Sequence, residues 1–143
     1  VAHAAVVRVN GSYEHIVPTA ANGALFTADA RTAPRTAKQR EWTDDRCRAH
    51  GRAPSAVAIR RDIYVGESRA DVEATTGPVI ARGYRGFDPG ALIAGTIDEV
   101  VRRFEDLGAM GYTDVIIRHL IDDQAKVLES LRRLEHVRLA LQP

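Results

Sequence analysis

The segment from residue 93 to residue 120 constrains the fold more than any other part of this 143-residue chain. Thr96 is placed as an N-cap, and Glu99 follows at the three-residue spacing of a capping box. Apolar residues then recur at the period of a helix and form one stripe: Ile97, Val100, Val101, Phe104 and Leu107. Gly108 marks the expected helix end, and the β-branched run 115–117 indicates a short strand covered on both faces. A helix followed by such a strand is half of a βαβ unit.

The rest of the chain also alternates between strands and helices, which predicts a parallel sheet. Besides the elements above, strands are expected at 12–17 and 56–65, and helices at 35–50, 69–82 and 122–139. Residues 18–34 and 83–95 show little periodicity and are expected to be long irregular connections. A closed eight-stranded barrel needs at least about 200 residues. The sequence therefore predicts a single α/β domain over residues 1–143, with about three parallel strands and flanking helices, that forms part of a TIM (β/α)8 barrel.

Composition argues against several classes of protein. The formal net charge of +1 gives no global field that would attract nucleic acid or an acidic membrane. No apolar run approaches the roughly 18 residues of a membrane span. The single Cys47 excludes an intrachain disulfide, which suits a reducing, cytoplasmic compartment. The histidines have no ligand spacing with Cys, Asp or Glu, so no metal site is expected.

Three stretches in the second half of the chain form a recognisable series. They are RRDIYVGES at 60–68, GYRGF at 83–87 and IAGTIDEVVRRFEDLGAMGYTDVIIRHL at 93–120. In their order and spacing they resemble the carboxyl-terminal part of the bacterial-luciferase-like flavin-dependent oxidoreductases. In that family a strand ends in a Val-Gly-Glu-type turn, and a Gly-Ser/Thr-x-x-Glu turn opens an amphipathic helix. A short strand and a leucine-rich last helix then follow.

The resemblance implies a TIM-barrel monooxygenase or oxidoreductase that acts on a small organic substrate. Its cofactor would be FMN or a deazaflavin coenzyme of the F-420 type, which reacts with oxygen or passes a hydride when reduced. The loops at 18–34 and 83–95 would shape the substrate pocket. Most flavin contacts in the family come from earlier strands, so the isolated chain is expected to be inactive. Its expected partner is the missing barrel half or a second copy of the chain.

Arg118 and His119 end the last expected strand, at the edge of the sheet where barrel enzymes act. Arg118 could bind a substrate carboxylate or a phosphate through a bidentate pair. His119 is the candidate catalytic residue, because an imidazole there could polarise a carbonyl or stabilise a flavin oxyanion. The alternative is that both residues cap the strand and pair with Asp122 or Asp123.

The strand at 56–65 carries several charged side chains. Alternation places Arg60, Asp62 and Tyr64 on one face and Arg61 on the other. Charged side chains in a strand are costly unless they are paired, so these residues either pair inside a barrel or line a polar pocket. A structural role is favoured for Arg60 or Arg61. Arg61 and Tyr64 are retained as candidates to bind the substrate.

Gly95 and Thr96 stand at a helix start, where free N–H groups attract anions, and are the candidate cofactor-binding residues. An ordinary helix cap explains the same two residues and is the favoured reading. Two further functions stay open. One is a non-catalytic α/β module that self-associates through open sheet edges. The other is binding of a polyanion by the basic segment 31–52, although its near lack of aromatic residues favours a solvated helix face.

Overall fold

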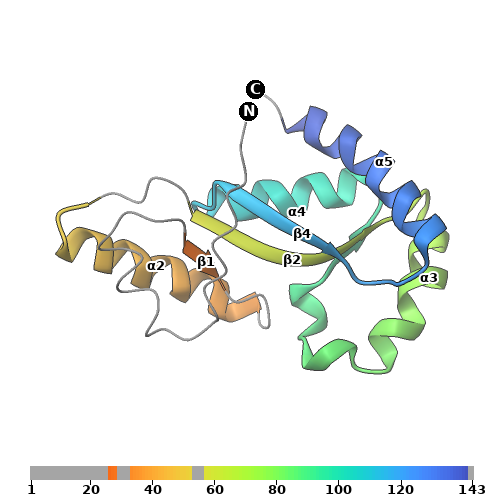
Figure 1. Cartoon of the computed structure of the whole chain (residues 1–143), viewed down its shortest axis with the longest axis horizontal. Coiled ribbons are helices and arrows are strands. Elements are labelled where there is room, and N and C mark those ends of the chain that lie inside the picture. The colour runs from red at the N-terminus through yellow and green to blue at the C-terminus, as the bar shows by residue number, and fades with distance from the viewer. Residues whose placement is uncertain (1–25, 29–32, 53–56, 142–143) are drawn as a thin grey trace.

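The computed structural model describes residues 26–28, 33–52 and 57–141 (Figure 1). In chain order the elements are β1 (Phe26–Ala28), α2 (Ala33–Ala49), β2 (Val57–Val65), α3 (Arg69–Ala81), η2 (Tyr84–Gly86), η3 (Pro89–Ala91), β3 (Ile93–Gly95), α4 (Ile97–Ala109), β4 (Asp114–His119) and α5 (Gln124–Ala140), where η denotes a 3-10 helix. The strand expected at 12–17 lies outside the described residues. None of the described helices is long and apolar enough to cross a membrane.

Strand β2 organises the sheet, because the other three described strands all pair with it in parallel. β4 pairs along Ala58–Ile63, while β1 pairs with Val57–Ile59 and β3 with Ile63–Val65. Since β1 and β4 both pair with Ala58 and Ile59, they lie on opposite edges of β2. The predicted α/β fold with parallel strands is confirmed.

Two short strands correct the expectation of long irregular connections. β1 lies within 18–34, and β3 lies at the end of 83–95. Each has only three residues, which is too short for the alternation that identifies a strand in a sequence. β3 forms because Ile93 is buried beside β2 and because the Gly95 carbonyl accepts a hydrogen bond from the Gly66 amide. Part of the 83–95 connection is therefore fixed to the carboxyl end of the sheet.

One face of the sheet, termed here the helix-covered face, packs against α4 and α5 (Figure 1). Alternation along β2 turns Ile59, Ile63 and Val65 to this side. The other buried members of the cluster are Ile93, Val100, Leu107, Tyr112 and Val137, and Trp42 of α2 packs against them. The apolar stripe of 97–107 faces this core, as its period predicts.

The opposite face of β2 carries Ala58, Arg60, Asp62 and Tyr64. A second buried cluster lies at its carboxyl end, where Val72 of α3 packs with Tyr64, Leu120 and Ile121. α3 begins at the Ser68 cap, whose hydroxyl accepts a hydrogen bond from the Asp71 amide. This places α3 beyond the carboxyl end of the sheet rather than on the helix-covered face.

Candidate functional site

A groove lies beyond the carboxyl end of β4, between α3, η2 and the start of α5. Its volume is about 560 Å³, and its lining residues are Thr75, Val79, Arg82, Tyr84, Arg85, Leu120, Ile121, Asp122, Asp123 and Lys126. This volume falls within the range of small-molecule sites. Ligands of open and closed parallel sheets bind beyond the carboxyl ends of the strands. The groove is therefore the candidate functional site.

The wall of the groove is anchored to the sheet through Tyr84. The Tyr84 hydroxyl donates to Oδ2 of Asp62 across 2.8 Å. Arg118 donates from Nη2 to the same carboxylate oxygen across 2.8 Å, and to the Tyr84 hydroxyl oxygen across 3.0 Å. Asp62 is fully buried, and its Oδ1 lies 3.9 Å from Nε of Arg60. These four residues are called the Asp62 cluster below.

Two members of the Asp62 cluster, Tyr84 and Arg118, have pKa values raised by their surroundings. Burial raises the pKa of Tyr84, so its hydroxyl stays protonated and can donate. Burial by itself lowers the pKa of Arg118, but the Tyr84 hydroxyl and the Asp62 carboxylate more than offset it and raise the pKa overall. Oδ1 of Asp62 and the Nε atoms of Arg60 and Arg118 are buried and make no hydrogen bond within the described structure. The cluster therefore combines two cations and one carboxylate with unused donors and one unused acceptor.

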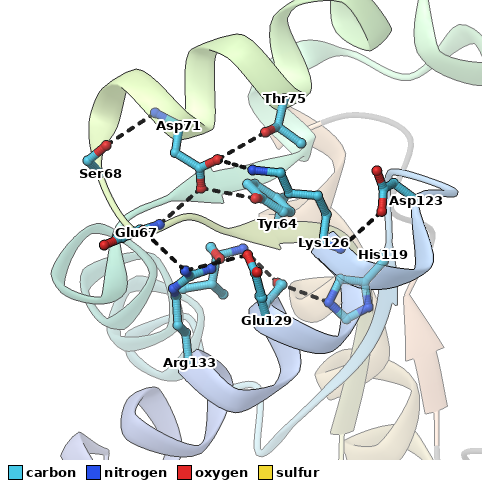
Figure 2. A network of polar contacts seen from close by, with 12 residues as sticks. Tyr64, Glu67, Ser68, Asp71, Thr75, His119, Asp123, Lys126, Glu129 and Arg133 are labelled. Atoms are coloured by element: carbon cyan, nitrogen blue, oxygen red, sulfur yellow. Dashed lines mark hydrogen bonds and ion pairs between the residues drawn. The ribbon is translucent and has the colours of Figure 1, made fainter.

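A second polar network lies beside the groove, around Asp71 (Figure 2). Oδ2 of Asp71 accepts hydrogen bonds from the Tyr64 hydroxyl at 3.0 Å and from the Glu67 amide at 3.1 Å. Its Oδ1 accepts from Nζ of Lys126 at 2.6 Å and from the Thr75 hydroxyl at 3.2 Å. The bond from Lys126 is the main reason that the pKa of Asp71 falls to about 2. This network ties α3 to β2 and to α5.

His119 lies on the helix-covered face, away from the Asp62 cluster. It is the register partner of Ile63, so its side chain points to the same side as that core residue. Its Nε2 lies 3.0 Å from Oγ of Ser130 in α5, and the Val65 amide donates to the same oxygen across 2.9 Å (Figure 2). Burial lowers the pKa of His119. This position favours a structural role, and the predicted catalytic role of His119 stays a prediction.

Arg61 also lies on the helix-covered face, as alternation predicts. Its side chain is 3% exposed and lines a separate cavity of about 300 Å³ with Arg103, Asp106 and Met110, near α4 and η3. Nη1 of Arg61 donates to the carbonyl of Arg60. This cavity shares no lining residue with the groove, and Arg61 lies on the other face of the sheet from Arg118 and Tyr64.

Thr96 is the N-cap of α4 and forms a capping box with Glu99, while Gly95 is the last residue of β3. Oε2 of Glu99 accepts from the Thr96 amide across 2.9 Å, and this bond lowers the pKa of Glu99. A Cβ atom on Gly95 would lie 2.8 Å from Cβ of Glu99. A carboxylate therefore already occupies the place where a bound phosphate would accept hydrogen bonds. The geometry favours the helix cap over a cofactor site.

The structure thus separates the predicted site residues. Arg118 and Tyr64 lie on the groove side of the sheet, whereas His119 and Arg61 lie on the helix-covered face. The alternative pairing of Arg118 with Asp122 or Asp123 is wrong, because Arg118 binds Asp62. Sequence reasoning missed Tyr84, Arg82 and Arg85 of the groove. The GYRGF stretch at 83–87 was the one sequence feature that pointed to this region. It has no periodicity that would predict which of its side chains face the sheet.

No group of three or more His, Cys, Asp or Glu side chains in the described part of the chain is placed to bind a metal ion. No protein-family model matches the sequence. A search of the curated proteins likewise finds no match.

Solved structures give the informative comparison. Monooxygenase RslO1 from Streptomyces bottropensis matches with a TM-score of 0.67 at 16% identity, over 89% of this chain and 44% of its own. EDTA monooxygenase (EmoA) from Chelativorans sp. BNC1 matches with a TM-score of 0.64 at 15% identity, over 94% of this chain and 46% of its own. The chain has the fold of part of a luciferase-like barrel.

A further match to this fold was solved with a flavin. It is the oxygenating constituent of 3,6-diketocamphane monooxygenase from Pseudomonas putida, in complex with FMN. Its TM-score is 0.61 at 13% identity, over 84% of this chain and 43% of its own. The chain thus spans less than half of the length of each of these three monooxygenases. The resemblance to luciferase-like proteins and the partial barrel, both predicted from the sequence, are confirmed at the level of the fold.

Proposed function

We propose that the chain is the carboxyl-terminal part of an FMN- or deazaflavin-dependent oxidoreductase or monooxygenase that acts on a small organic substrate. The observation that supports this is the position of the groove. It lies beyond the carboxyl end of β4, in a fold shared with three monooxygenases.

The role of this chain in the proposed reaction is to bind and orient the substrate. Leu120 and Ile121 are buried apolar residues of the groove, and Val79 of α3 also lines it. Tyr84 presents a ring whose hydroxyl is already fixed by Asp62 and Arg118. Arg118 therefore acts as a positioning residue for this wall of the groove.

The flavin would supply the redox chemistry when bound. The residues predicted to hold its phosphate, Gly95 and Thr96, do not fit a phosphate, because the Glu99 carboxylate accepts the hydrogen bond of the Thr96 amide and lies against Gly95. No step is therefore derived through them. The proposal leaves most flavin contacts to a missing barrel half, supplied by a longer chain or a second copy, so that the 143-residue chain alone is inactive.

The test uses the full reading frame that contains this sequence, alongside the chain alone. The longer protein is expected to bind FMN or the deazaflavin and to quench its fluorescence, with one of the two bound more tightly. It should consume oxygen or oxidise its reduced flavin in the presence of substrate, whereas the isolated chain should not. A longer protein that quenches neither flavin overturns the proposal.

A second candidate is a non-catalytic module that self-associates. β4 pairs with β2 along one edge, and no strand in the described part of the chain pairs with its other edge. Ile117 of β4 is 37% exposed. An unpaired strand with an exposed apolar side chain can pair with the same strand of a second copy. Light scattering coupled to size exclusion would show a stable dimer that Ile117→Lys disrupts. A monomer at high concentration eliminates this candidate.

A further inference from the structure

Two arginines at the groove have no carboxylate partner among the described residues. Its lining includes three cations, Arg82, Arg85 and Lys126, and two carboxylates, Asp122 and Asp123. Lys126 is neutralised by Asp71 at 2.6 Å. The Asp123 carboxylate accepts from the Lys126 amide and so caps the start of α5.

Two arginines and two carboxylates remain after this pairing, since a hydrogen bond from a backbone amide leaves the charge of Asp123 in place. Neither Arg82 nor Arg85 forms an ion pair with any described residue, and Asp122 likewise has no cationic partner among them. The formal charges at the groove therefore balance, but neither guanidinium group has a carboxylate partner. A guanidinium without a carboxylate partner at a groove is suited to bind an anionic group through paired N–H donors.

Arg85 is held in an unusual conformation that points to a role. It is the one described non-glycine residue with positive φ, at 49°. A non-glycine residue in this region costs free energy and is enriched at binding sites. The conformation places its guanidinium carbon 5.6 Å from the centroid of the Tyr84 ring. Because the Tyr84 hydroxyl is hydrogen-bonded to Asp62 and Arg118, its ring is held in one position. The Arg85 guanidinium therefore lies over a ring that is fixed in place.

The other lining residues determine the rest of the ligand. Leu120 and Ile121, which are 3% and 8% exposed, line the groove together with the half-buried Val79. A ligand that fills the groove therefore meets apolar side chains away from the charges. This combination does not suit a free inorganic ion, which has no apolar part.

We propose that the groove binds a small organic anion, with its charged group at Arg82 and Arg85 and its apolar body against Leu120 and Ile121. The inference rests on the proposed function, because it assigns the substrate class of that reaction. It also predicts that Asp122 opposes binding, since its carboxylate faces the same groove.

The test is an NMR titration of the 15N-labelled chain with benzoate, with benzamide as the neutral molecule of the same shape. Benzoate is expected to shift the amide resonances of residues 82–85 and 120–123 in a saturable way. Benzamide should bind about fivefold more weakly or not measurably, and added salt should weaken benzoate binding. Equal binding of the two molecules overturns the inference.

Four variants test the charges directly. Arg82→Gln and Arg85→Gln should each weaken benzoate binding by about twofold to fivefold, the size expected for a partly exposed ion pair. Asp122→Asn should strengthen it by a similar factor. Arg132→Gln is the matched control, since Arg132 is exposed on α5, does not line the groove and loses the same charge. Equal losses in Arg85→Gln and Arg132→Gln would contradict the inference.

Two further titrations separate this inference from the proposed function. Inorganic phosphate that binds at the groove, with benzoate ineffective, overturns the substrate class and favours a phosphate group instead. Quenching of FMN or deazaflavin fluorescence by the longer protein reports flavin binding. A third outcome is that the variants change benzoate affinity in the predicted order while the longer protein binds no flavin. That outcome supports the anion groove and rejects only the flavin reaction.

Discussion

Nζ of Lys126 lies 2.6 Å from Oδ1 of Asp71, and this bond joins the first turn of α5 to the first turn of α3. The two residues are 55 positions apart in the chain. The Tyr64 hydroxyl donates to the other oxygen of the same Asp71 carboxylate (Figure 2). One carboxylate thus holds together the three elements that surround the base of the groove.

Replacing Asp71 by Asn should lower the stability of the protein and change how stability depends on pH. The pKa of Asp71 is about 2 in the folded protein and 3.8 as the reference value, so its stabilisation is present above pH 4. It is lost as the pH falls from about 4 to 2, because the unfolded chain takes up the proton first. We expect Asp71→Asn to cost roughly 1–2 kcal/mol at pH 7, measured by urea unfolding at several pH values.

Glu73→Gln is the control for Asp71→Asn. Glu73 lies in the same helix and pairs with Arg69, but both side chains are largely exposed. Its replacement should change stability little. If Asp71→Asn leaves the acid dependence of wild-type stability unchanged, the network does not contribute as proposed.

Replacing Asp62 and replacing Arg118 should lower the free energy of unfolding by different amounts. Arg118→Met leaves a fully buried carboxylate short of a donor, which is expected to cost about 3 kcal/mol or more. Asp62→Leu should cost less, because the side chain of Arg118 is 38% exposed and its charge can reach water.

The double variant Asp62→Leu/Arg118→Met completes the thermodynamic cycle. Its loss should be smaller than the sum of the two single losses, because no charge is left unpaired between the two positions. Chemical unfolding of the four proteins measures the coupling. Strictly additive losses would show that the two side chains do not interact.

The imidazole of His119 should titrate below its ordinary pKa of 6.5, since burial disfavours its charged form. Near pH 6.5 the imidazole therefore binds a proton more readily in the unfolded chain than in the folded protein. The free energy of unfolding falls as the pH is lowered through 6.5. NMR of the imidazole resonances measures the pKa, and unfolding curves between pH 7.5 and about 5.5 measure the linked stability. A His119→Phe protein with the same pH dependence would assign the effect elsewhere.

The capping box of α4 should contribute about 1 kcal/mol to stability. Glu99→Ala removes the acceptor of the Thr96 amide, and thermal unfolding is expected to shift accordingly. Glu105→Ala is the control, because Glu105 is an exposed residue in the interior of the same helix. A measurable gain in phosphate affinity in Glu99→Ala would revive the anion site that the Gly95–Thr96 sequence predicts.

Local signals in the sequence predicted most of the helices and the central strand. The Thr96–Glu99 cap, the apolar stripe after it and the run 115–117 each specify structure within a few residues, and the structure has the capped helix and the strand. The expectation that this strand is covered on both faces is wrong, because Ile117 is 37% exposed on a strand that has β2 as its one partner among the described strands. β1 and β3 escaped prediction because three residues carry no periodicity, and their strand geometry comes from pairing with β2.

The candidate site was harder to predict because it depends on register between distant segments. Alternation showed that Arg60, Asp62 and Tyr64 share a face, but only the pairing of β2 with β4 brings Arg118 to Asp62. The same register turns His119 away from them, next to Ser130. Which way the Tyr84 ring points depends on the left-handed backbone at Gly83 and Arg85, which no pattern of residue types records.

The pairing of β2 with every other described strand also has a kinetic consequence. Its long partner β4 lies 56 positions later in the chain, as the Asp62–Arg118 bond shows. Because contacts so far apart in sequence close slowly, this sheet is expected to form in milliseconds to seconds rather than microseconds. On the ribosome, β2 would lack its long partner until β4 has been synthesised, and its unpaired edge favours aggregation during that interval.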